Sequence, residues 1–248
     1  MNTLTLVTIC YNSVRTIQRT VDSVLRQRRL PQQYLFVDGG STDGTLELLD
    51  GLRHQLQAKG VLTDLIHQVR QPHMAGIPHA WNLGIGAASG DVVALLNSDD
   101  WYEDDALRQY MDAFEANPEF LAVSAPIYMR NPDGSLAYLL PSRSLRLLPI
   151  LMPIPHPGCF FRRLLYEQIG GYDPEYSISA DYDFIWRCHR LNLKFHRLPR
   201  PLVNMEIGGK ANANRALARE ETYRIAKKYA PHSPLPGLAR LLRRMTGR

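Results

Sequence analysis

Acidic side chains gather at three places where an apolar run of the sequence ends. The first is NSDDW at 97–101, where Asp99 and Asp100 are adjacent and a large aromatic residue, Trp101, follows. Two neighbouring carboxylates raise each other's pKa unless a cation lies between them. Mg²⁺ suits one or two carboxylates together with phosphate oxygens and water. The pair therefore indicates a divalent cation beside a diphosphate, although a helix start with Asp99 as its N-cap would also accommodate two acids.

The second acidic segment, VDGGSTDGT at 37–45, combines an acid with a glycine turn. Asp38 ends an apolar run, two glycines permit a tight turn, and Ser41 or Thr42 then opens a helix. Helix N-terminal amides can receive a phosphate, and a strand-end carboxylate can accept hydrogen bonds from a base or a ribose. The segment is neither a GxGxxG fingerprint nor a P-loop. It indicates either a nucleotide contact or a plain glycine turn with a capping serine.

The third segment, SADYDF at 179–184, carries Asp181 and Asp183 two residues apart before an expected helix. Their side chains would point in different directions. One could face a cleft as a general base while the other caps the helix, or both could be caps.

A scaffold must bring these segments together, and the first hundred residues predict one. Apolar strands alternate with amphipathic helices, which is typical of a mostly parallel sheet with helices on its faces. In such sheets ligands bind beyond the carboxyl ends of the strands. Ser13 is the expected N-cap of the first helix and Gly60 the expected end of the second. The expected strands are 3–9, 34–38, 62–69 and 91–97, and the expected helices are 14–28, 41–60 and 76–90.

The pattern is less regular after residue 120. A strand over 121–129 and its hairpin partner at 136–140 flank the turn NPDG. Four prolines exclude a long helix over 145–158, which we expect to be a buried meander or a mobile lid. Helices are expected over 162–173 and 181–192. We find no internal repeat.

Composition limits the class of protein. The 248 residues are 45% hydrophobic and 21% charged, which excludes a wholly disordered or fibrous chain. No apolar run is long enough to span a bilayer, and the N-terminus does not resemble a signal peptide, so we expect a cytoplasmic protein. Cys10, Cys159 and Cys188 are far apart, and we expect buried, reduced thiols.

The net charge of +5 is unevenly distributed. No acid follows Glu221, so the excess of positive charge lies in the tail, and a globally basic nucleic-acid surface is not indicated. The segment 237–248 has leucines at helical spacing with arginines between them. It is either an ordinary terminal helix or a segment that lies on an anionic membrane. The basic residues of this tail include Lys227, Lys228, Arg240, Arg243, Arg244 and Arg248.

In this order, the motifs resemble those of the inverting family 2 glycosyltransferases, which have the nucleotide-sugar-binding fold called GT-A. The resemblance covers about residues 3–210. It rests on VTICYN (7–12), VDGGSTDGT (37–45), GIPHAWNLGIGAASGDVVALLNSDDWY (76–102), HPGCFFRR (156–163), GGYDPEYSISADYDF (170–184) and GG (208–209). It implies a GT-A domain over 1–210, with a nucleotide-binding half at 1–102 and an acceptor half at 103–210, followed by a basic helical extension at 211–248.

The resemblance also implies roles for individual residues. Asp99 and Asp100 would hold Mg²⁺ or Mn²⁺ against the diphosphate, and Asp181 would be the catalytic base, with Asp183 as second choice. Trp101 and His156 are candidates for the acceptor side, each with ordinary packing as the alternative. The implied nucleotide contacts are Thr8, Tyr11, Asn12, Asp38, Ser41, Asn82, Asn97, Ser98 and Asp99.

Some positions depart from the commoner family pattern. Asn97 stands where many relatives carry the first acid of an Asp-x-Asp motif, and Trp81 stands where many carry an arginine. The Gln-x-x-Arg-Trp signature of processive enzymes is absent. We therefore expect transfer of one sugar from a nucleoside diphosphate sugar to a glycan or lipid-linked acceptor, in surface polysaccharide or glycolipid assembly. A nucleotidyltransferase and a non-catalytic scaffold are the rival interpretations.

Overall fold

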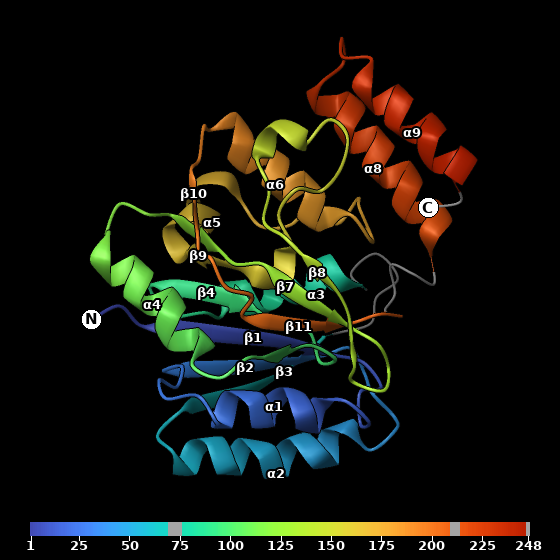
Figure 1. Ribbon diagram of the computed structural model, residues 1–248. Helices are drawn as coiled ribbons and strands as arrows, with labels where there is room; N and C mark the ends of the chain where they lie inside the picture. Colours follow the sequence, from blue (N-terminus) through green and yellow to red (C-terminus); the bar gives the residue numbers. More distant parts are fainter. Residues whose placement is uncertain (69–75, 209–213, 247–248) are drawn as a thin grey trace.

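The computed structural model describes residues 1–68, 76–208 and 214–246. Its largest element is a seven-stranded sheet in the order β10-β6-β9-β4-β1-β2-β3 (Figure 1). All neighbouring strands are parallel except β9, which pairs antiparallel with both β4 and β6. The expected mostly parallel sheet is confirmed. The strands are β1 (Leu4–Cys10), β2 (Gln33–Asp38), β3 (Leu62–His67), β4 (Val92–Leu95), β6 (Ala122–Ser124), β9 (Cys159–Arg162) and β10 (Phe195–Arg197).

A second sheet of four strands has the order β5-β11-β7-β8. It consists of β5 (Trp101–Tyr102), β11 (Val203–Glu206), β7 (Ile127–Arg130) and β8 (Leu136–Leu140). The single strand expected over 121–129 is wrong, because the chain leaves the large sheet after β6 and enters the small sheet at β7. Pro126, which lacks a backbone N–H, lies in the break. The expected hairpin is confirmed by the antiparallel pairing of β7 with β8.

Helices cover both faces of the large sheet. One face packs against α1 (Ile17–Leu25), α2 (Thr45–Ala58), α4 (Ala106–Ala116) and the small sheet, and the other packs against α3 (Ile77–Gly86), α5 (Arg163–Ile169) and α6 (Ala180–Arg190). β1 shows the alternation behind this arrangement: Leu4 and Leu6 point into the first core and Val7 into the second. Figure 1 shows α1 and α2 below the sheet, with α5 and α6 above it.

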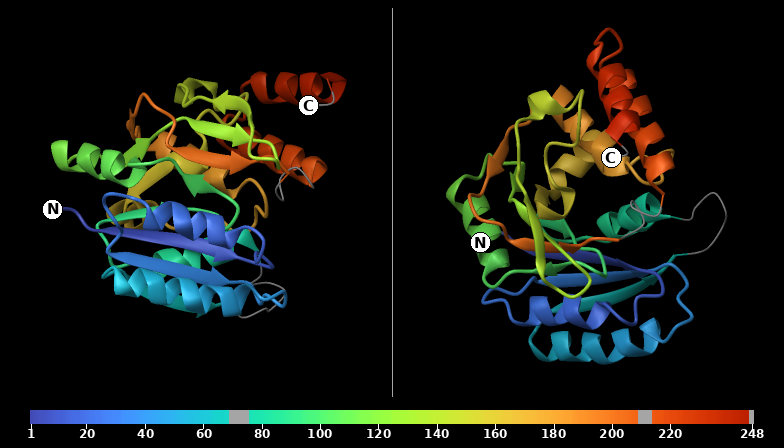
Figure 2. Two further views of the ribbon diagram at one scale, coloured as in Figure 1. Left: turned by 60° about the horizontal axis from the view of Figure 1, so that its bottom comes forward. Right: turned by 45° about the vertical axis from the view of Figure 1, so that its right-hand side comes forward.

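The chain ends in a helical hairpin of α8 (Arg215–Tyr229) and α9 (Leu235–Thr246). The right-hand view of Figure 2 shows it standing beside α6, away from α1 and α2. Both helices lie in the predicted extension 211–248. The expected domain boundary at residue 210, and Gly209 of the motif GG, lie outside the described residues. None of the helices described is both long and apolar enough to cross a bilayer.

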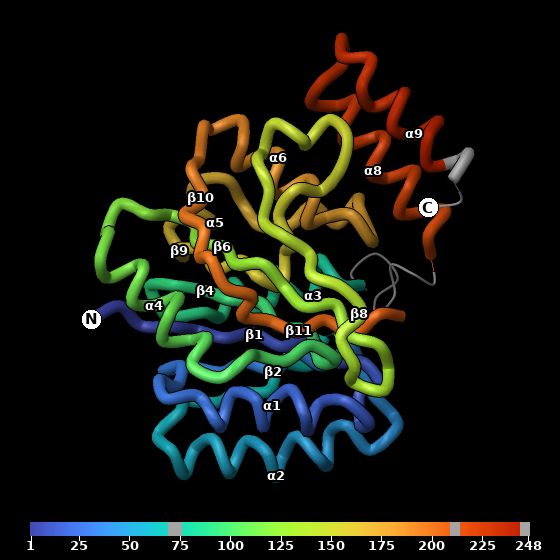
Figure 3. Tube along the Cα trace, in the orientation of Figure 1, coloured from blue at the N-terminus to red at the C-terminus, as the bar shows by residue number. Residues whose placement is uncertain are grey.

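The trace in Figure 3 shows that the first part of the chain forms the layers around β1, β2 and β3, and the second part crosses above them. Because β9 lies between β4 and β6, one sheet runs through both predicted halves. The segment 145–158 has no long helix and contains two short 3₁₀ turns, Leu145–Leu147 and His156–Gly158. All three cysteines are free and buried, as expected, and burial raises the pKa of each thiol.

Two predicted caps are wrong in position. Thr16 is the N-cap of α1, and Ser13 contributes its carbonyl, which accepts from the amides of Thr16 and Ile17 at 3.0 Å each. α2 begins at Thr45 rather than at Ser41 or Thr42, because Asp43 accepts from the Thr45 amide at 3.1 Å and ends the preceding turn. The expected helix end is confirmed in part: α2 closes at Lys59, and Gly60 follows with φ 81°, a conformation that favours glycine.

Candidate active site

The loops that follow β1, β2 and β4 are tied together at one edge of the large sheet. Ser13 and Ser98 share a hydroxyl hydrogen bond at 2.7 Å, which joins the loops after β1 and β4. The Asn12 amide donates to the Ser41 hydroxyl at 2.9 Å, which joins the loops after β1 and β2. Thr20 of α1 donates to the carbonyl of Ser98 at 2.9 Å. The sheet therefore brings two of the three acidic segments to a common edge, as the βα alternation requires.

The loop after β1 presents two of the predicted nucleotide contacts. Tyr11 is 44% exposed. Asn12 is exposed with φ 52°, a left-handed conformation that asparagine tolerates better than most residues, and its side-chain oxygen accepts from the Thr42 amide at 2.9 Å. Thr8, the third contact predicted on this strand, is fully buried, and its hydroxyl is bonded to the Tyr34 hydroxyl at 2.9 Å. Its nucleotide contact stays a prediction.

Asp38 is also buried, and its carboxylate is occupied within its own loop. It accepts from the amides of Gly40 at 2.7 Å and Ser41 at 2.9 Å, and from the Ser41 hydroxyl at 2.5 Å. In this conformation Asp38 shapes the turn, and its contact with a base stays a prediction. The Ser41 hydroxyl is shared between Asp38 and the amide of Asn12, so it too holds the loop.

The two acids of the NSDDW segment have different environments. Asp99 is half-buried, whereas Asp100 is 1% exposed and accepts a hydrogen bond from the Asn97 amide at 3.1 Å. Burial and then the charge of Asp99 hold the pKa of the Asp100 carboxyl well above its usual range. Of the two predicted metal ligands, Asp99 has the more accessible side chain in this conformation, and the metal contact of both stays a prediction. Ser98 is half-buried, with its hydroxyl on Ser13.

These residues fit a divalent cation that takes most of its ligands from the diphosphate of the substrate and from water. Burial raises the pKa of the Asp100 carboxyl most, and the neighbouring charge of Asp99 raises it further. A cation between the two carboxylates would offset that second effect. No group of three or more His, Cys, Asp and Glu side chains suited to a metal occurs within 1–68, 76–208 and 214–246. The protein would thus provide one or two carboxylates and leave the other positions to phosphate oxygens and water, as Mg²⁺ commonly requires.

Arg19 of α1 anchors the same segment. Its guanidinium lies 3.7 Å from the centre of the Trp101 ring, and one nitrogen donates to the Asp99 carbonyl at 3.0 Å and to the Glu206 carboxylate at 2.7 Å. A cation above an aromatic face is attractive. Trp101, a candidate for the acceptor side, is half-buried, and Arg19 covers one face of its ring. Sequence reasoning missed Arg19, whose partners are far away along the chain.

The third acidic segment opens α6. Asp181 and Asp183 both lie in its first turn, after the N-cap Ser179. Asp181 keeps partial exposure, and the protein packed around it raises the pKa of its carboxyl to about 6. That value suits a general base near neutral pH.

Asp183, the alternative base predicted from the sequence, joins two helices through hydrogen bonds and ion pairs, and its role as a base stays a prediction. It is fully buried, and its carboxylate accepts from Arg187 at 2.8 Å, Lys228 at 3.2 Å and the Tyr229 hydroxyl at 2.9 Å. With both oxygens engaged, it joins α6 to α8.

Asn82 of α3 connects the two predicted halves. Its amide nitrogen donates to the Tyr172 carbonyl at 2.8 Å, and its oxygen accepts from the Tyr172 amide at 2.8 Å. Gly171 allows this contact, since a Cβ there would lie 2.2 Å from the Asn82 oxygen. The Asn82 side chain is thus engaged by the Tyr172 backbone, and its predicted nucleotide contact stays a prediction.

His156 is packed, which is the alternative left open by the sequence. It is buried, it stacks on Trp81 with ring centres 5.0 Å apart, and its Nε2 lies 2.6 Å from the Tyr172 hydroxyl. Burial lowers its pKa to about 4. The residue that departs from the family pattern, Trp81, therefore packs against the loop that carries His156.

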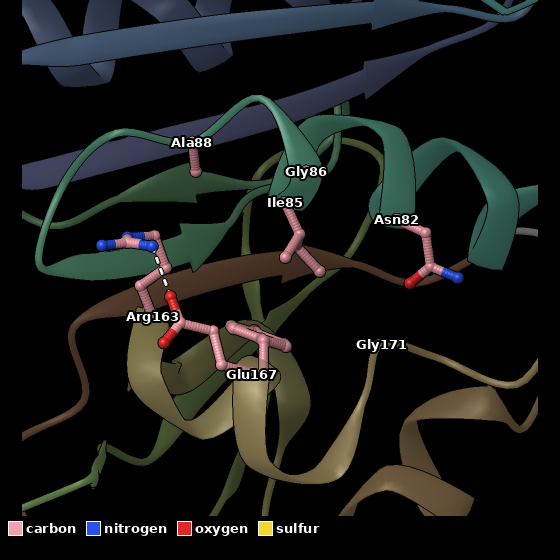
Figure 4. A pocket seen from close by; sticks show the side chains of 8 residues that line it. Asn82, Ile85, Gly86, Ala88, Arg163, Glu167 and Gly171 are labelled. Atoms are coloured by element: carbon pink, nitrogen blue, oxygen red, sulfur yellow. Dashed lines mark hydrogen bonds and ion pairs between the residues drawn. The ribbon is translucent and has the colours of Figure 1, made fainter.

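A cavity of about 310 Å³ lies between α3 and α5 (Figure 4). Figure 4 shows Arg163 paired with Glu167 on one side and Asn82 on the other. Asn82 is the only predicted site residue in its lining. The cavity is therefore separate from the edge where the strand-end loops meet.

Comparison with known proteins points to one family. The family model Glycosyl transferase family 2 matches residues 5–170. An uncharacterized glycosyltransferase of Mycobacterium tuberculosis is 29% identical over 193 residues, covering 75% of this chain and 68% of the relative. Chondroitin synthase of Pasteurella multocida is 28% identical over 202 residues, which is 80% of this chain and only 20% of that enzyme.

A solved structure shows the same fold. The mannosyltransferase PcManGT from Pyrobaculum calidifontis, in complex with GDP-Man and Mn²⁺, superposes with a TM-score of 0.70 at 16% identity. The match covers 95% of this chain and 68% of the mannosyltransferase. The GT-A fold expected from the sequence is confirmed.

Proposed function

This chain belongs to glycosyltransferase family 2, and from that premise we propose that it transfers one sugar, with inversion, from a nucleoside diphosphate sugar to an acceptor hydroxyl. The observation that carries the proposal is the joining of the strand-end loops. The bonds Ser13–Ser98 and Asn12–Ser41 fix the ends of β1, β2 and β4 around the exposed Tyr11 and the half-buried Asp99.

The donor would bind at this edge. Tyr11 and Asn12 offer an aromatic ring and amide groups to the nucleoside, while Ser41 and Asp38 hold the loop on its other side. Asp99 would hold Mg²⁺ or Mn²⁺, which when bound neutralises the charge of the departing diphosphate. The complex of PcManGT with GDP-Man and Mn²⁺ supports a metal in a fold of this kind.

Asp181 would act as the base. Its carboxylate takes the proton of the acceptor hydroxyl as that oxygen forms a bond to the anomeric carbon. The bond from this carbon to the diphosphate oxygen breaks on the opposite face, and its electron pair leaves with the nucleoside diphosphate. One such displacement inverts the configuration. The raised pKa of Asp181 and the engagement of Asp183 in ion pairs support this choice.

We assign the acceptor to a class only. The relatedness to chondroitin synthase supports a glycan acceptor in polysaccharide or glycolipid assembly. The proposed place of action is the cytoplasmic side of a membrane that carries this acceptor.

The α9 helix supports contact with such a membrane. Four leucines of α9 lie at helical spacing and are 38–55% exposed, namely Leu235, Leu238, Leu241 and Leu242. The neighbouring Ala239 is buried. The tail is basic, which complements anionic lipid. Vesicles of phosphatidylglycerol and phosphatidylcholine should sediment the protein, and the double variant L238E/L241E should abolish this, unlike the control L217E on α8. Membrane contact would be contradicted if L238E/L241E sedimented with the vesicles as much as the wild type does. Self-association of the protein through α9 would also contradict it.

Donor binding tests the enzymatic proposal. Calorimetry with UDP, GDP and dTDP, each with and without Mn²⁺, should show metal-dependent binding of one nucleotide, with transfer from the matching nucleotide sugar. Binding of none would favour the scaffold interpretation. Release of pyrophosphate from a sugar phosphate and a nucleoside triphosphate would favour the nucleotidyltransferase interpretation. The variant D99N should lose the effect of Mn²⁺ while keeping its fold.

A further inference from the structure

A buried acid of α8 holds the segment that leads into α6. Glu221 is 2% exposed, and its carboxylate accepts from three consecutive backbone amides. Ser177 donates to one oxygen at 2.8 Å, and Ile178 and Ser179 donate to the other at 2.9 Å and 2.8 Å. Glu221 comes from a distant part of the chain, outside the matched segment 5–170.

These bonds replace a local cap. Ser179 is the N-cap of α6, yet its side chain makes no capping hydrogen bond to the helix. Its hydroxyl instead lies 3.3 Å from the Ala218 carbonyl and from the Thr222 hydroxyl, both on α8. Amides near a helix N-terminus need partners, and a carboxylate there is favoured by the helix dipole. α8 supplies that carboxylate from outside the helix.

The held segment ends two residues before Asp181. With the backbone of 177–179 fixed by Glu221, and Asp183 fixed to Lys228 and Tyr229 of the same helix, both sides of Asp181 are anchored to α8. We propose that Glu221 is a positioning residue that sets the carboxylate of Asp181 for proton removal from the acceptor. This inference rests on the proposed function, and adds α8 to the machinery of the site.

The charge of Glu221 has a second effect. It adds to burial in raising the pKa of Asp181, and Asp181 in turn adds to burial in raising the pKa of the Cys159 thiol. Asp183 is turned toward Arg187, Lys228 and Tyr229. Neutralising Glu221 should thus lower the pKa of Asp181, whereas a change that keeps the charge should not.

Two substitutions separate geometry from charge. Glu221→Gln removes the charge and places an NH₂ group among three donors, and Glu221→Asp keeps the charge on a side chain too short to reach them. Both should lower kcat at least tenfold and leave the KM for the donor within twofold. The matched control is Glu220→Gln, on the same helix, where the half-exposed carboxylate pairs with Arg240 at 2.6 Å. It should leave kcat unchanged.

Carboxyl ¹³C NMR titration gives a readout that does not need activity. The Asp181 signal, assigned with D181N, should titrate at lower pH in E221Q and at the wild-type pH in E220Q and E221D. An unchanged kcat in both Glu221 variants overturns the inference. A rise in the KM for the donor as large as the fall in kcat also overturns it. If E221Q does not fold, the kcat and the donor KM of E221D test the inference. Wild-type protein without transfer activity, but with an Asp181 pKa that responds to E221Q, would instead overturn the proposed function.

Discussion

The guanidinium of Arg19 lies 3.7 Å from the centre of the Trp101 ring. It joins α1 to the segment that carries Asp99, and the bond from Arg19 to Glu206 extends this link to β11. A lysine would not reproduce this contact, because its ammonium is a compact point charge without the planar group that stacks on the Trp101 ring. Arg19 is therefore the residue we expect to fix the position of Asp99.

Substitution of Arg19 by lysine should weaken donor binding. We expect the Kd of the nucleotide with Mn²⁺ to rise about tenfold, equivalent to about 1.4 kcal/mol, while the Kd without metal changes little. Calorimetry with and without Mn²⁺ measures both. The exposed Arg15, on the loop before α1, provides the control R15K, which should behave as wild type. If the Kd without Mn²⁺ rises as much as the Kd with Mn²⁺, Arg19 acts on the nucleoside instead.

Gly171→Ala should destabilise the connection between the halves. The added Cβ would lie 2.2 Å from the side-chain oxygen of Asn82, so the paired bonds to Tyr172 must break or shift. We expect a loss of about 1–3 kcal/mol in the free energy of unfolding, measured by urea denaturation. The control G51A lies within α2, where a Cβ meets nothing within 4 Å, and should gain about 0.5–1 kcal/mol. No loss in G171A would mean that Asn82 does not clamp Tyr172.

His156 should make stability depend on pH. Its folded pKa of about 4 is below the ordinary value of 6.5, so the unfolded chain binds more protons between these values. The contribution of neutral His156 is complete above pH 6.5 and is lost as the pH falls to about 4; it amounts to about 3 kcal/mol.

The difference in unfolding free energy between wild type and H156Q should therefore shrink from pH 7 to pH 4.5. Urea denaturation at each pH gives this difference and cancels the titration of other groups. A constant difference would show that His156 titrates normally and is accessible to water.

The fold was predictable from the sequence because apolar periodicity reports burial directly. The βα alternation over the first hundred residues placed β1, β2, β3 and β4, and the strand ends predicted where Tyr11, Asn12 and Asp99 would gather. The break at Pro126 was missed, since an apolar run does not reveal that it is divided between two sheets.

The contacts of the site residues were not predictable in the same way, because a motif gives the type of a residue but not the direction of its side chain. Asp38, Asp100 and Asn82 match the family motifs, yet the structure turns them toward their own loops or toward Tyr172. Arg19 and Glu221 were missed for a related reason: their partners are distant in sequence, and no local spacing marks them.

Activity should depend on the protonation of Asp181. With a carboxyl pKa of about 6, the base is ready only in its ionised form, so kcat/KM should rise as the pH increases through about 6 and level off above it. A pH–rate profile from 5 to 8, at saturating Mn²⁺, measures this. A flat profile across that range would exclude Asp181 as the group that takes the proton.

The most direct measurement of the central claim compares transfer and donor binding in Asp181→Asn. This change keeps the size of the side chain and removes the base. We predict a fall in kcat of about 10²-fold or more, with the Kd of the donor in Mn²⁺ within twofold of wild type. If the variant transfers sugar at the wild-type rate, Asp181 is not the base, and the proposed mechanism is wrong.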